Sequence, residues 1–183
     1  MNTAVEMIDK LRDTTQSHDR CSVVEVMGRN AGYIALNTGI ACGALVTLIP
    51  EVPYDLERDV ISRMKATQKT GKRHFIIIVA EGVGRAHDIA NEIQSRTGID
   101  SRATVLGHVQ RGGSPSAYDR VLATEFGTYA AKLIEADHYG VAVAMRNNIV
   151  TSNPLKDIAG KTKLVPETCD MLTVARRMGI SLG

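Results

Sequence analysis

Apolar residues recur along this chain at two different spacings, and the two spacings alternate. Ala4, Met7, Ile8 and Leu11 are three or four residues apart, which predicts a helix near the start of the chain. Short apolar runs rich in β-branched residues predict strands over 22–27, 45–49, 74–80, 102–106 and 141–145. Helical spacing between these runs predicts helices over 31–42, 56–69, 86–96 (closed by Gly98) and 117–135. Further on, Asn147-Asn148 predicts a turn, 149–152 a short strand and 171–178 a last helix.

The alternation of strands and helices indicates the fold class. Several of the predicted strands are unbroken apolar runs, and Phe75–Ala80 is the longest of these. Strands of this kind are typical of sheets that are buried on both faces. We therefore predict an α/β fold with a mostly parallel sheet and helices on both of its faces.

Composition and charge exclude several classes of protein. The chain has 183 residues, of which 44% are apolar and 23% charged, so it is expected to fold around its own core without a disulfide or metal. The three cysteines form no metal-binding or disulfide pattern, and no apolar run is long enough to cross a membrane. We expect a cytoplasmic protein that interacts with neither membranes nor nucleic acids, since the net charge is only +2 and aromatic residues are few.

Candidate chemistry follows the predicted strands. Ligands of open α/β sheets bind beyond the carboxyl ends of the strands, where this chain places Met27-Gly28-Arg29, Glu81-Gly82 and the segment 107–113. The last segment contains three glycines together with His108, Gln110 and Arg111, a composition suited to an anionic, oxygen-rich ligand. The alternative is a flexible connection with solvated charges.

Arg29 and Glu81 each allow two interpretations. Arg29 is expected at the start of a helix, where a bound anion would offset its unfavourable position, or it is an exposed side chain neutralised by Glu25 or by solvent. Glu81 ends a strand that should be buried, where its carboxylate could accept hydrogen bonds from sugar hydroxyls or pair with an arginine. Together with the basic residues, these positions suggest a phosphorylated sugar as ligand. Arg20 and Arg102 begin strands and are expected at the opposite edge of the sheet.

Several motifs closely resemble the C-terminal half of 6-phosphofructokinases of the bacterial ATP-dependent type, over residues 1 to about 145. They are Val26-Met-Gly-Arg29 with Gly32, Pro50-Glu51, Ala80-Glu-Gly82, and Arg102-Ala-Thr-Val-Leu-Gly-His-Val-Gln-Arg-Gly-Gly-Ser-Pro115 followed by Tyr118-Asp-Arg120. The resemblance implies transfer of the γ-phosphoryl group of ATP to the 1-hydroxyl of fructose 6-phosphate, a step of glycolysis. It also implies that fructose 6-phosphate is held in its own subunit by Met27, Gly28, Arg29, Glu81, His108 and Arg111, and by Arg20 and Arg102 of a neighbouring subunit in a homotetramer.

The same resemblance implies an incomplete catalytic apparatus among these residues. The family's catalytic aspartate, nucleotide motif and Mg²⁺-binding positions precede the matched region, so no catalytic or metal-binding residue is expected here. The complete enzyme would use ATP and Mg²⁺, whereas the isolated chain is expected to bind neither and to be inactive. An alternative phosphoryl donor is pyrophosphate, although the form of the segment 107–113 favours ATP. A different class of function is a free-standing module that binds a sugar phosphate or effector.

A second anion site is also implied by the resemblance. Arg12, Gly43, Lys72 and His74 match positions of the family's effector site. Two other positions depart from the family pattern, because Leu45 replaces a glutamate that helps to hold ADP-bound magnesium and Thr70 replaces an arginine. These changes disfavour activation by ADP, while the retained basic residues could bind phosphoenolpyruvate or another anion.

The resemblance further implies a division into domains. Residues 1–109 would form the smaller, fructose 6-phosphate-binding domain, 110–159 part of the larger nucleotide domain, and 160–183 a tail that returns to the smaller one. The middle segment would lack its sheet partners. We therefore expect exposed apolar surface on the helix over 117–135, which should cause self-association or local disorder.

Overall fold

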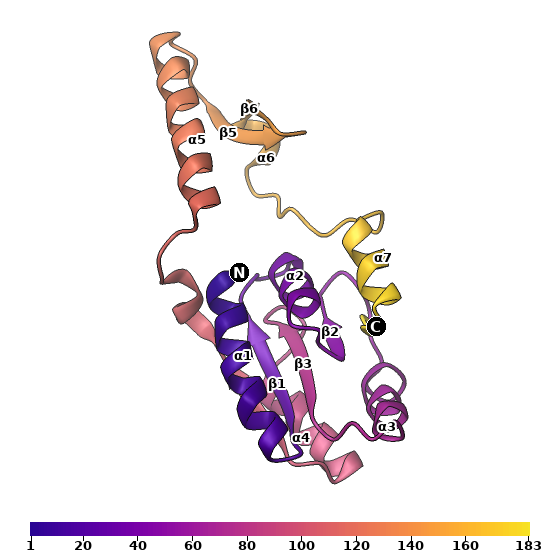
Figure 1. The fold of residues 1–183 in the computed structure, drawn as a ribbon. Coiled ribbons are helices and arrows are strands. Elements are labelled where there is room, and N and C mark those ends of the chain that lie inside the picture. The colour runs from indigo at the N-terminus through magenta and orange to yellow at the C-terminus, as the bar shows by residue number, and fades with distance from the viewer. The chain divides into compact units, whose positions relative to one another are not determined.

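The computed structural model describes residues 1–183 and divides them into two compact units. Unit 1 comprises Met1–Gly112 and Lys163–Gly183, and unit 2 comprises Gly113–Thr162. The helices α1 to α7 and strands β1 to β6 are coloured along the chain in Figure 1.

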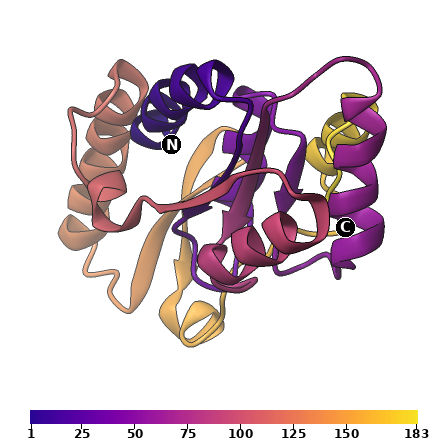
Figure 2. The same cartoon turned by 90° about the horizontal axis from the view of Figure 1, so that it is seen from below.

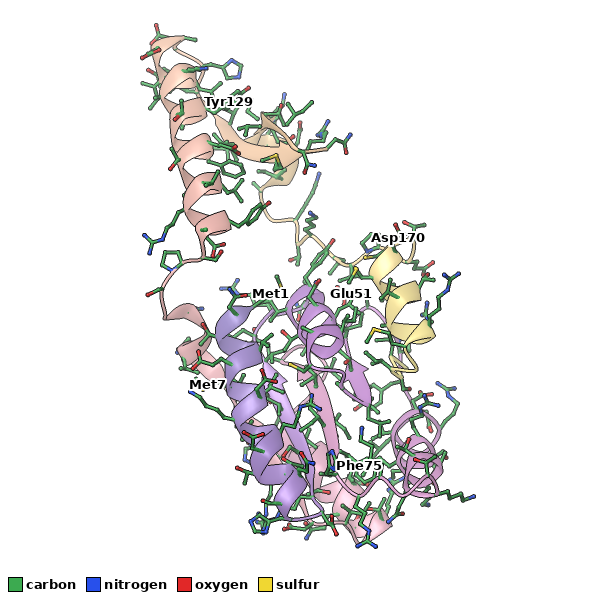
Figure 3. All side chains as sticks on the ribbon, viewed as in Figure 1. Met1, Met7, Glu51, Phe75, Tyr129 and Asp170 are labelled. Atoms are coloured by element: carbon green, nitrogen blue, oxygen red, sulfur yellow. The ribbon has the colours of Figure 1, made fainter.

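Unit 1 is built on a parallel sheet of four strands in the order β2-β3-β1-β4. The strands are β1 (Cys21–Val26), β2 (Val46–Leu48), β3 (Phe75–Ala80) and β4 (Ser101–Val105). All six residues of the central strand β3 are buried, including Phe75 at its start (Figure 3), because helices cover both faces of the sheet. The predicted α/β fold with a parallel sheet is confirmed.

Alternate side chains of the strands divide the core into two layers. Val24 and Val26 point toward α1 (Asn2–Ser17), α2 (Tyr33–Ala41) and α7 (Asp170–Arg177). Cys21 and Val23 point to the other face, toward α3 (Ser62–Gln68) and α4 (Ala86–Thr97). Figure 2 shows α1 and α4 on opposite sides of the sheet.

Most predicted helices and strands of unit 1 are confirmed within a few residues, and two segments differ. The predicted helix over 56–69 begins as a π-helical turn, η1 (Leu56–Ile61), and continues as α3. The glycine-rich connection is not an irregular loop, because Gly107–Arg111 forms a 3-10 turn, η2. Gly98 ends α4 in the left-handed conformation with a φ of 73°, which glycine adopts without a steric cost.

Unit 2 consists of α5 (Ala117–Glu135), the strands β5 (Val141–Arg146) and β6 (Ile149–Pro154), and the short helix α6 (Leu155–Ile158). Ser116 and Asp119 form a capping box at the start of α5. The two strands form an antiparallel hairpin that turns at Asn147 and Asn148, both with positive φ, as the Asn-Asn pair predicts. The strand predicted over 141–145 therefore belongs to this hairpin and not to the parallel sheet.

The structure also lacks two kinds of feature. None of its helices combines the length and the apolar character needed to cross a membrane. No three side chains among histidine, cysteine, aspartate and glutamate are gathered closely enough to hold a metal ion.

Candidate functional site at the carboxyl edge of the sheet

The carboxyl ends of β1 and β3 form a topological switch point. The two strands are neighbours in the sheet, but the chain leaves β1 toward α2 on one face and leaves β3 toward α4 on the other. A crevice at such a point is the usual binding site of open α/β sheets. The candidate residues Met27, Gly28 and Arg29 follow β1, and Glu81 follows β3.

The segment after β1 is a tight turn that only certain residues can form. Gly28 has a φ of 148°, and a Cβ atom there would lie 2.5 Å from the carbonyl oxygen of Ala31. Arg29 also has a positive φ, of 51°, and its side chain is exposed. The expected position of Arg29 at the start of a helix is wrong, because α2 begins at Tyr33.

Glu81 holds this turn through the backbone. Its Oε1 accepts hydrogen bonds from the N–H groups of Gly28, at 3.3 Å, and of Arg29. The carboxylate thus pairs with main-chain donors and not with an arginine side chain, while it stays exposed to solvent. Of the two alternatives for an exposed Arg29, pairing with Glu25 is wrong, since the Glu25 carboxylate accepts a hydrogen bond from Ala86 N–H at the start of α4. Exposure of Arg29 to solvent is what the structure has.

Gly82 permits the close approach of the two segments. A Cβ atom at this position would lie 2.2 Å from the carbonyl oxygen of Arg29 and 3.0 Å from Pro50. Only glycine fits this distance without moving the backbone. The turns after β1 and β3 are therefore packed against each other through main-chain atoms.

The 3-10 turn η2 adds the third part of the site. Leu106 N–H donates to the carbonyl oxygen of Glu25 at 3.1 Å, which ties the end of β4 to β1. The Gln110 Oε1 accepts a hydrogen bond from Met27 N–H at 3.2 Å, and its Nε2 donates to the carbonyl oxygen of Gly107 at 3.1 Å. His108 and Arg111 lie on the same turn with exposed side chains. Three segments far apart in sequence thus converge at the carboxyl edge.

Two further candidate arginines, Arg20 and Arg102, lie at the amino edge of the same sheet. Arg20 directly precedes β1 and Arg102 is the second residue of β4. The Arg20 Nε donates to Asp100 Oδ2 at 2.6 Å, and the Arg102 Nε lies 3.0 Å from Asp100 Oδ1. The structure therefore separates Arg20 and Arg102 from the residues that follow the strands, and it joins them to each other through Asp100.

A second basic cluster also lies at the amino edge. Arg12 on α1 donates a hydrogen bond to the carbonyl oxygen of Cys42, next to Gly43, which has a φ of 57°. His74 directly precedes β3, and its pKa is lowered mainly by burial and further by the positive charges of Lys72 and Arg12, against the opposing effect of Asp19. Lys72 and Arg12 are therefore both near enough to His74 to disfavour its protonated form.

Sequence reasoning missed three residues that organise these sites. For Gln110, the sequence indicates only a polar residue within the segment 107–113, and nothing in the pattern assigns it the bridge to Met27. Glu51 accepts hydrogen bonds from Gly32 N–H at 2.9 Å and from Val165 N–H at 2.9 Å, which connects α2 to the C-terminal segment. Asp100 stands two residues before Arg102, so strand alternation alone could have placed the two on the same face.

Comparison with known proteins identifies the family. The family model described as phosphofructokinase matches residues 1–134. The chain belongs to the phosphofructokinase family. It is 48% identical over 180 residues to the ATP-dependent 6-phosphofructokinase of Bacillus mycoides (strain KBAB4), and 44% identical over 180 residues to the protein of that name from Halalkalibacterium halodurans. Each of these matches covers 98% of the chain and 56% of the relative. The chain thus spans about half the length of the curated relatives it matches.

Solved phosphofructokinase structures share the fold. The phosphofructokinase of Saccharomyces cerevisiae matches with a TM-score of 0.79 and 32% sequence identity, over 97% of this chain and 24% of that one. A pyrophosphate-dependent phosphofructokinase of Nitrosospira multiformis matches with a TM-score of 0.74 and 22% identity, over 90% of this chain and 46% of that one. At that identity the second likeness concerns the fold alone.

Proposed function

We propose that this chain supplies the C-terminal, acceptor-binding half of a cytoplasmic ATP-dependent 6-phosphofructokinase. In this role it binds fructose 6-phosphate, whose 1-hydroxyl receives the γ-phosphoryl group of ATP. The observation that supports the proposal best is the convergence of the turns after β1, β3 and β4 at a switch point, held together by Glu81 and Gln110. ATP is proposed as donor because the relatives at 44–48% identity are named ATP-dependent.

The chemistry of the carboxyl edge suits a sugar phosphate. Arg29, His108 and Arg111 are exposed side chains that can donate to phosphate oxygens, and Arg111 can do so with two nitrogens. A phosphomonoester carries about −1.5 to −2 charges near neutral pH, and each charge-assisted hydrogen bond contributes about 1.5–3 kcal/mol. The Glu81 carboxylate uses one oxygen for the turn after β1, which leaves the other free to accept from a sugar hydroxyl.

Further contributions would come from the amino edge and from the rest of the enzyme. In this proposal Arg20 and Arg102 face the sugar phosphate of a neighbouring subunit in a tetramer, and residues 1–109 with 160–183 form the substrate domain. Arg12, Gly43, Lys72 and His74 would form an effector site for an anion. The residues do not fit a Mg²⁺ site, because no three potential ligands are gathered. In this proposal ATP and Mg²⁺ are bound by other parts of the complete enzyme, as the family resemblance implies.

The test is a calorimetric titration of the 183-residue chain with fructose 6-phosphate. We expect saturable binding that unphosphorylated fructose does not reproduce, and a loss of about tenfold or more in affinity for Arg111→Ala. Arg177→Ala is the matched control, since Arg177 is also exposed but lies on α7, away from the proposed contacts. Equal affinity for fructose, or an unchanged affinity in Arg111→Ala, would contradict the proposed site.

A second measurement tests whether the isolated chain is catalytically inactive. The purified chain is expected to form no fructose 1,6-bisphosphate from ATP and fructose 6-phosphate, because positioning of the nucleotide and metal is assigned to other residues. Detectable ATP-dependent product from the chain alone would show that this assignment is wrong. The DNA upstream of the codon for Met1 is a further test. An in-frame nucleotide-binding half encoded there would support a kinase half, and a start codon at Met1 would support a free-standing binding module.

A further inference from the structure

Asp100 is an acidic side chain for which neither the family likeness nor the sequence motifs supply a role. It lies between the end of α4 and the start of β4, and its own carbonyl oxygen accepts a hydrogen bond from Cys21 N–H at 3.0 Å. That bond extends the parallel pairing of β1 with β4, in which Cys21 is opposite Ser101 and Ser22 opposite Arg102. Asp100 is therefore fixed by the sheet directly beside Arg20.

The sheet register also fixes the two arginines around this carboxylate. The carbonyl oxygen of Arg20 accepts a hydrogen bond from Phe75 N–H at 2.9 Å, so the backbone of Arg20 is held by β3. Arg102 is two residues after Asp100, which places both side chains on the same side of the strand. One carboxylate oxygen contacts each arginine, Oδ2 that of Arg20 and Oδ1 that of Arg102.

Arg20 donates one hydrogen bond to Asp100, from Nε, and Arg102 forms an ion pair with it that is not a hydrogen bond. Both ion pairs run through Nε, at 2.6 Å for Arg20 and 3.0 Å for Arg102. The terminal nitrogens of both groups are thereby left to donate to another acceptor, in a fork geometry that matches phosphate oxygens. The side chains stay accessible, since 33% of the Arg20 side chain and 68% of the Arg102 side chain are exposed.

The charges favour the same conclusion. Two guanidinium groups gathered without a counter-ion repel each other, and a carboxylate between them compensates one of the two charges. The group of three keeps a net charge of +1, so it still attracts an anion. If the Asp100 carboxylate only competed with an anionic ligand, it would be expected to bind the terminal nitrogens of the two guanidinium groups, which are the nitrogens that the ligand would use.

We propose that Asp100 is a positioning residue that holds Arg20 and Arg102 side by side as one unit for binding a phosphate group. The contribution of this unit to a neighbouring sugar-phosphate site rests on the proposed function. Its ability to bind a phosphate group as a pair does not, and the experiment separates the two.

The probe is inorganic phosphate, added to the full 183-residue chain labelled with ¹⁵N. The Nε–H signals of Arg20 and Arg102 are assigned with the variants Arg20→Lys and Arg102→Lys. As phosphate is added, the chemical shifts of both signals are expected to change with the same midpoint concentration. Asp100→Asn is expected to weaken this binding about fivefold or more and to separate the two responses, and Asp100→Glu to restore affinity to within about twofold. Asp13→Asn, the same change at an exposed position of α1 without an ion pair, is expected to leave both responses unchanged.

Asp100→Ser is measured in parallel, so that the result does not depend on the stability of a single variant, and backbone amide spectra verify folding. Unchanged or tighter phosphate binding in a folded Asp100→Asn or Asp100→Ser chain would overturn the proposal, as would independent midpoints in the unmodified chain. Fructose 6-phosphate is titrated separately. A chain that shows the paired response to phosphate but does not bind fructose 6-phosphate contradicts the proposed function and keeps the role of Asp100.

Discussion

Gln110 connects two loops of the carboxyl edge through a single side chain. Its carbonyl oxygen accepts from Met27 N–H and its amide nitrogen donates to the Gly107 carbonyl oxygen, so both of its polar groups are used. Because His108 and Arg111 share its turn, Gln110 sets the distance between these donors and the turn after β1. It acts through the backbone and needs no contact of its own with a ligand.

Replacing Gln110 is therefore expected to weaken binding more than it weakens the fold. Gln110→Ala removes two hydrogen bonds at a half-buried position and should lower the free energy of unfolding by about 1–2 kcal/mol. It should also lower the affinity for fructose 6-phosphate about threefold to tenfold, because the donors of η2 lose their fixed position. Urea unfolding and calorimetry measure the two effects. Gln16→Ala, on the exposed surface of α1, is the control, and equal affinity in both variants would contradict the role of Gln110.

His74 makes the amino edge sensitive to pH. Burial and the neighbouring positive charges lower its pKa in the folded chain, relative to about 6.5 in an unfolded one. The folded state therefore binds a proton less readily than the unfolded state. This contribution to stability is complete above pH 6.5 and is lost as the pH falls through the lowered pKa of the folded chain.

We expect the NMR titration midpoint of the His74 ring to lie below 6.5 and to rise when inorganic phosphate is added, since an anion stabilises the protonated ring. Stability should fall less steeply on acidification in His74→Asn than in the unmodified chain. His18→Asn, which removes an exposed imidazole at the end of α1, should not reduce the slope in this way. A midpoint at or above 6.5 without phosphate would show that the charges around His74 are arranged differently.

At the scale of elements, Glu51 joins α2 to the C-terminal segment. Its carboxylate accepts from Gly32 N–H, at the N-terminal cap of α2, and from Val165 N–H, whose residue is 3% exposed. The space around Gly32 is so restricted that a Cβ atom there would lie 2.4 Å from the Cβ of Ile49. A negative charge at the start of a helix is also favoured by the helix dipole.

Glu51→Ala should leave two N–H groups without their acceptor and lower the free energy of unfolding by about 2–4 kcal/mol. Glu51→Gln keeps an acceptor oxygen and should retain about half of this stability. Urea unfolding measures the loss, and faster hydrogen exchange at the Gly32 and Val165 amides would locate it. Glu167→Ala, at an exposed position of the same C-terminal segment, provides the comparison. A loss no larger than in that variant would mean that the connection is not important for stability.

The periodicity of the sequence predicts elements well and their side-chain partners poorly. The helix over 117–135 and the turn at Asn147-Asn148 are predicted correctly because the capping, spacing and turn preferences that form them act between nearby residues. The π-helical start at Leu56 and the positive φ of Arg29 have no such local signal. Glu81, Gln110 and Asp100 each contact a residue that is distant in sequence, namely Gly28, Met27 and Arg20. These contacts depend on which strands pair and in which register.

At the scale of the whole molecule, the two units differ in how much of their surface is buried. Unit 1 contains the entire buried core, including all of β3, whereas α5 in unit 2 has no buried residue. Large apolar side chains of unit 2 are exposed, among them Tyr118 at 70%, Val121 at 59% and Ile134 at 61%. A helix beside a two-stranded hairpin has little core of its own, so we expect this exposed apolar surface to bind another protein surface.

We therefore expect the 183-residue chain to associate with itself through α5. Sedimentation velocity should show an average mass that rises with protein concentration, and the double variant Tyr118→Thr/Val121→Thr should shift association to higher concentration because it removes exposed apolar area without adding charge. Ala123→Thr is the control, since it adds a threonine to an exposed position of the same helix and removes no large apolar side chain. The amides of α5 should also exchange faster than those of β3, because the helix has no buried face. A monomeric mass at every concentration, together with protection of α5 equal to that of β3, would contradict this expectation.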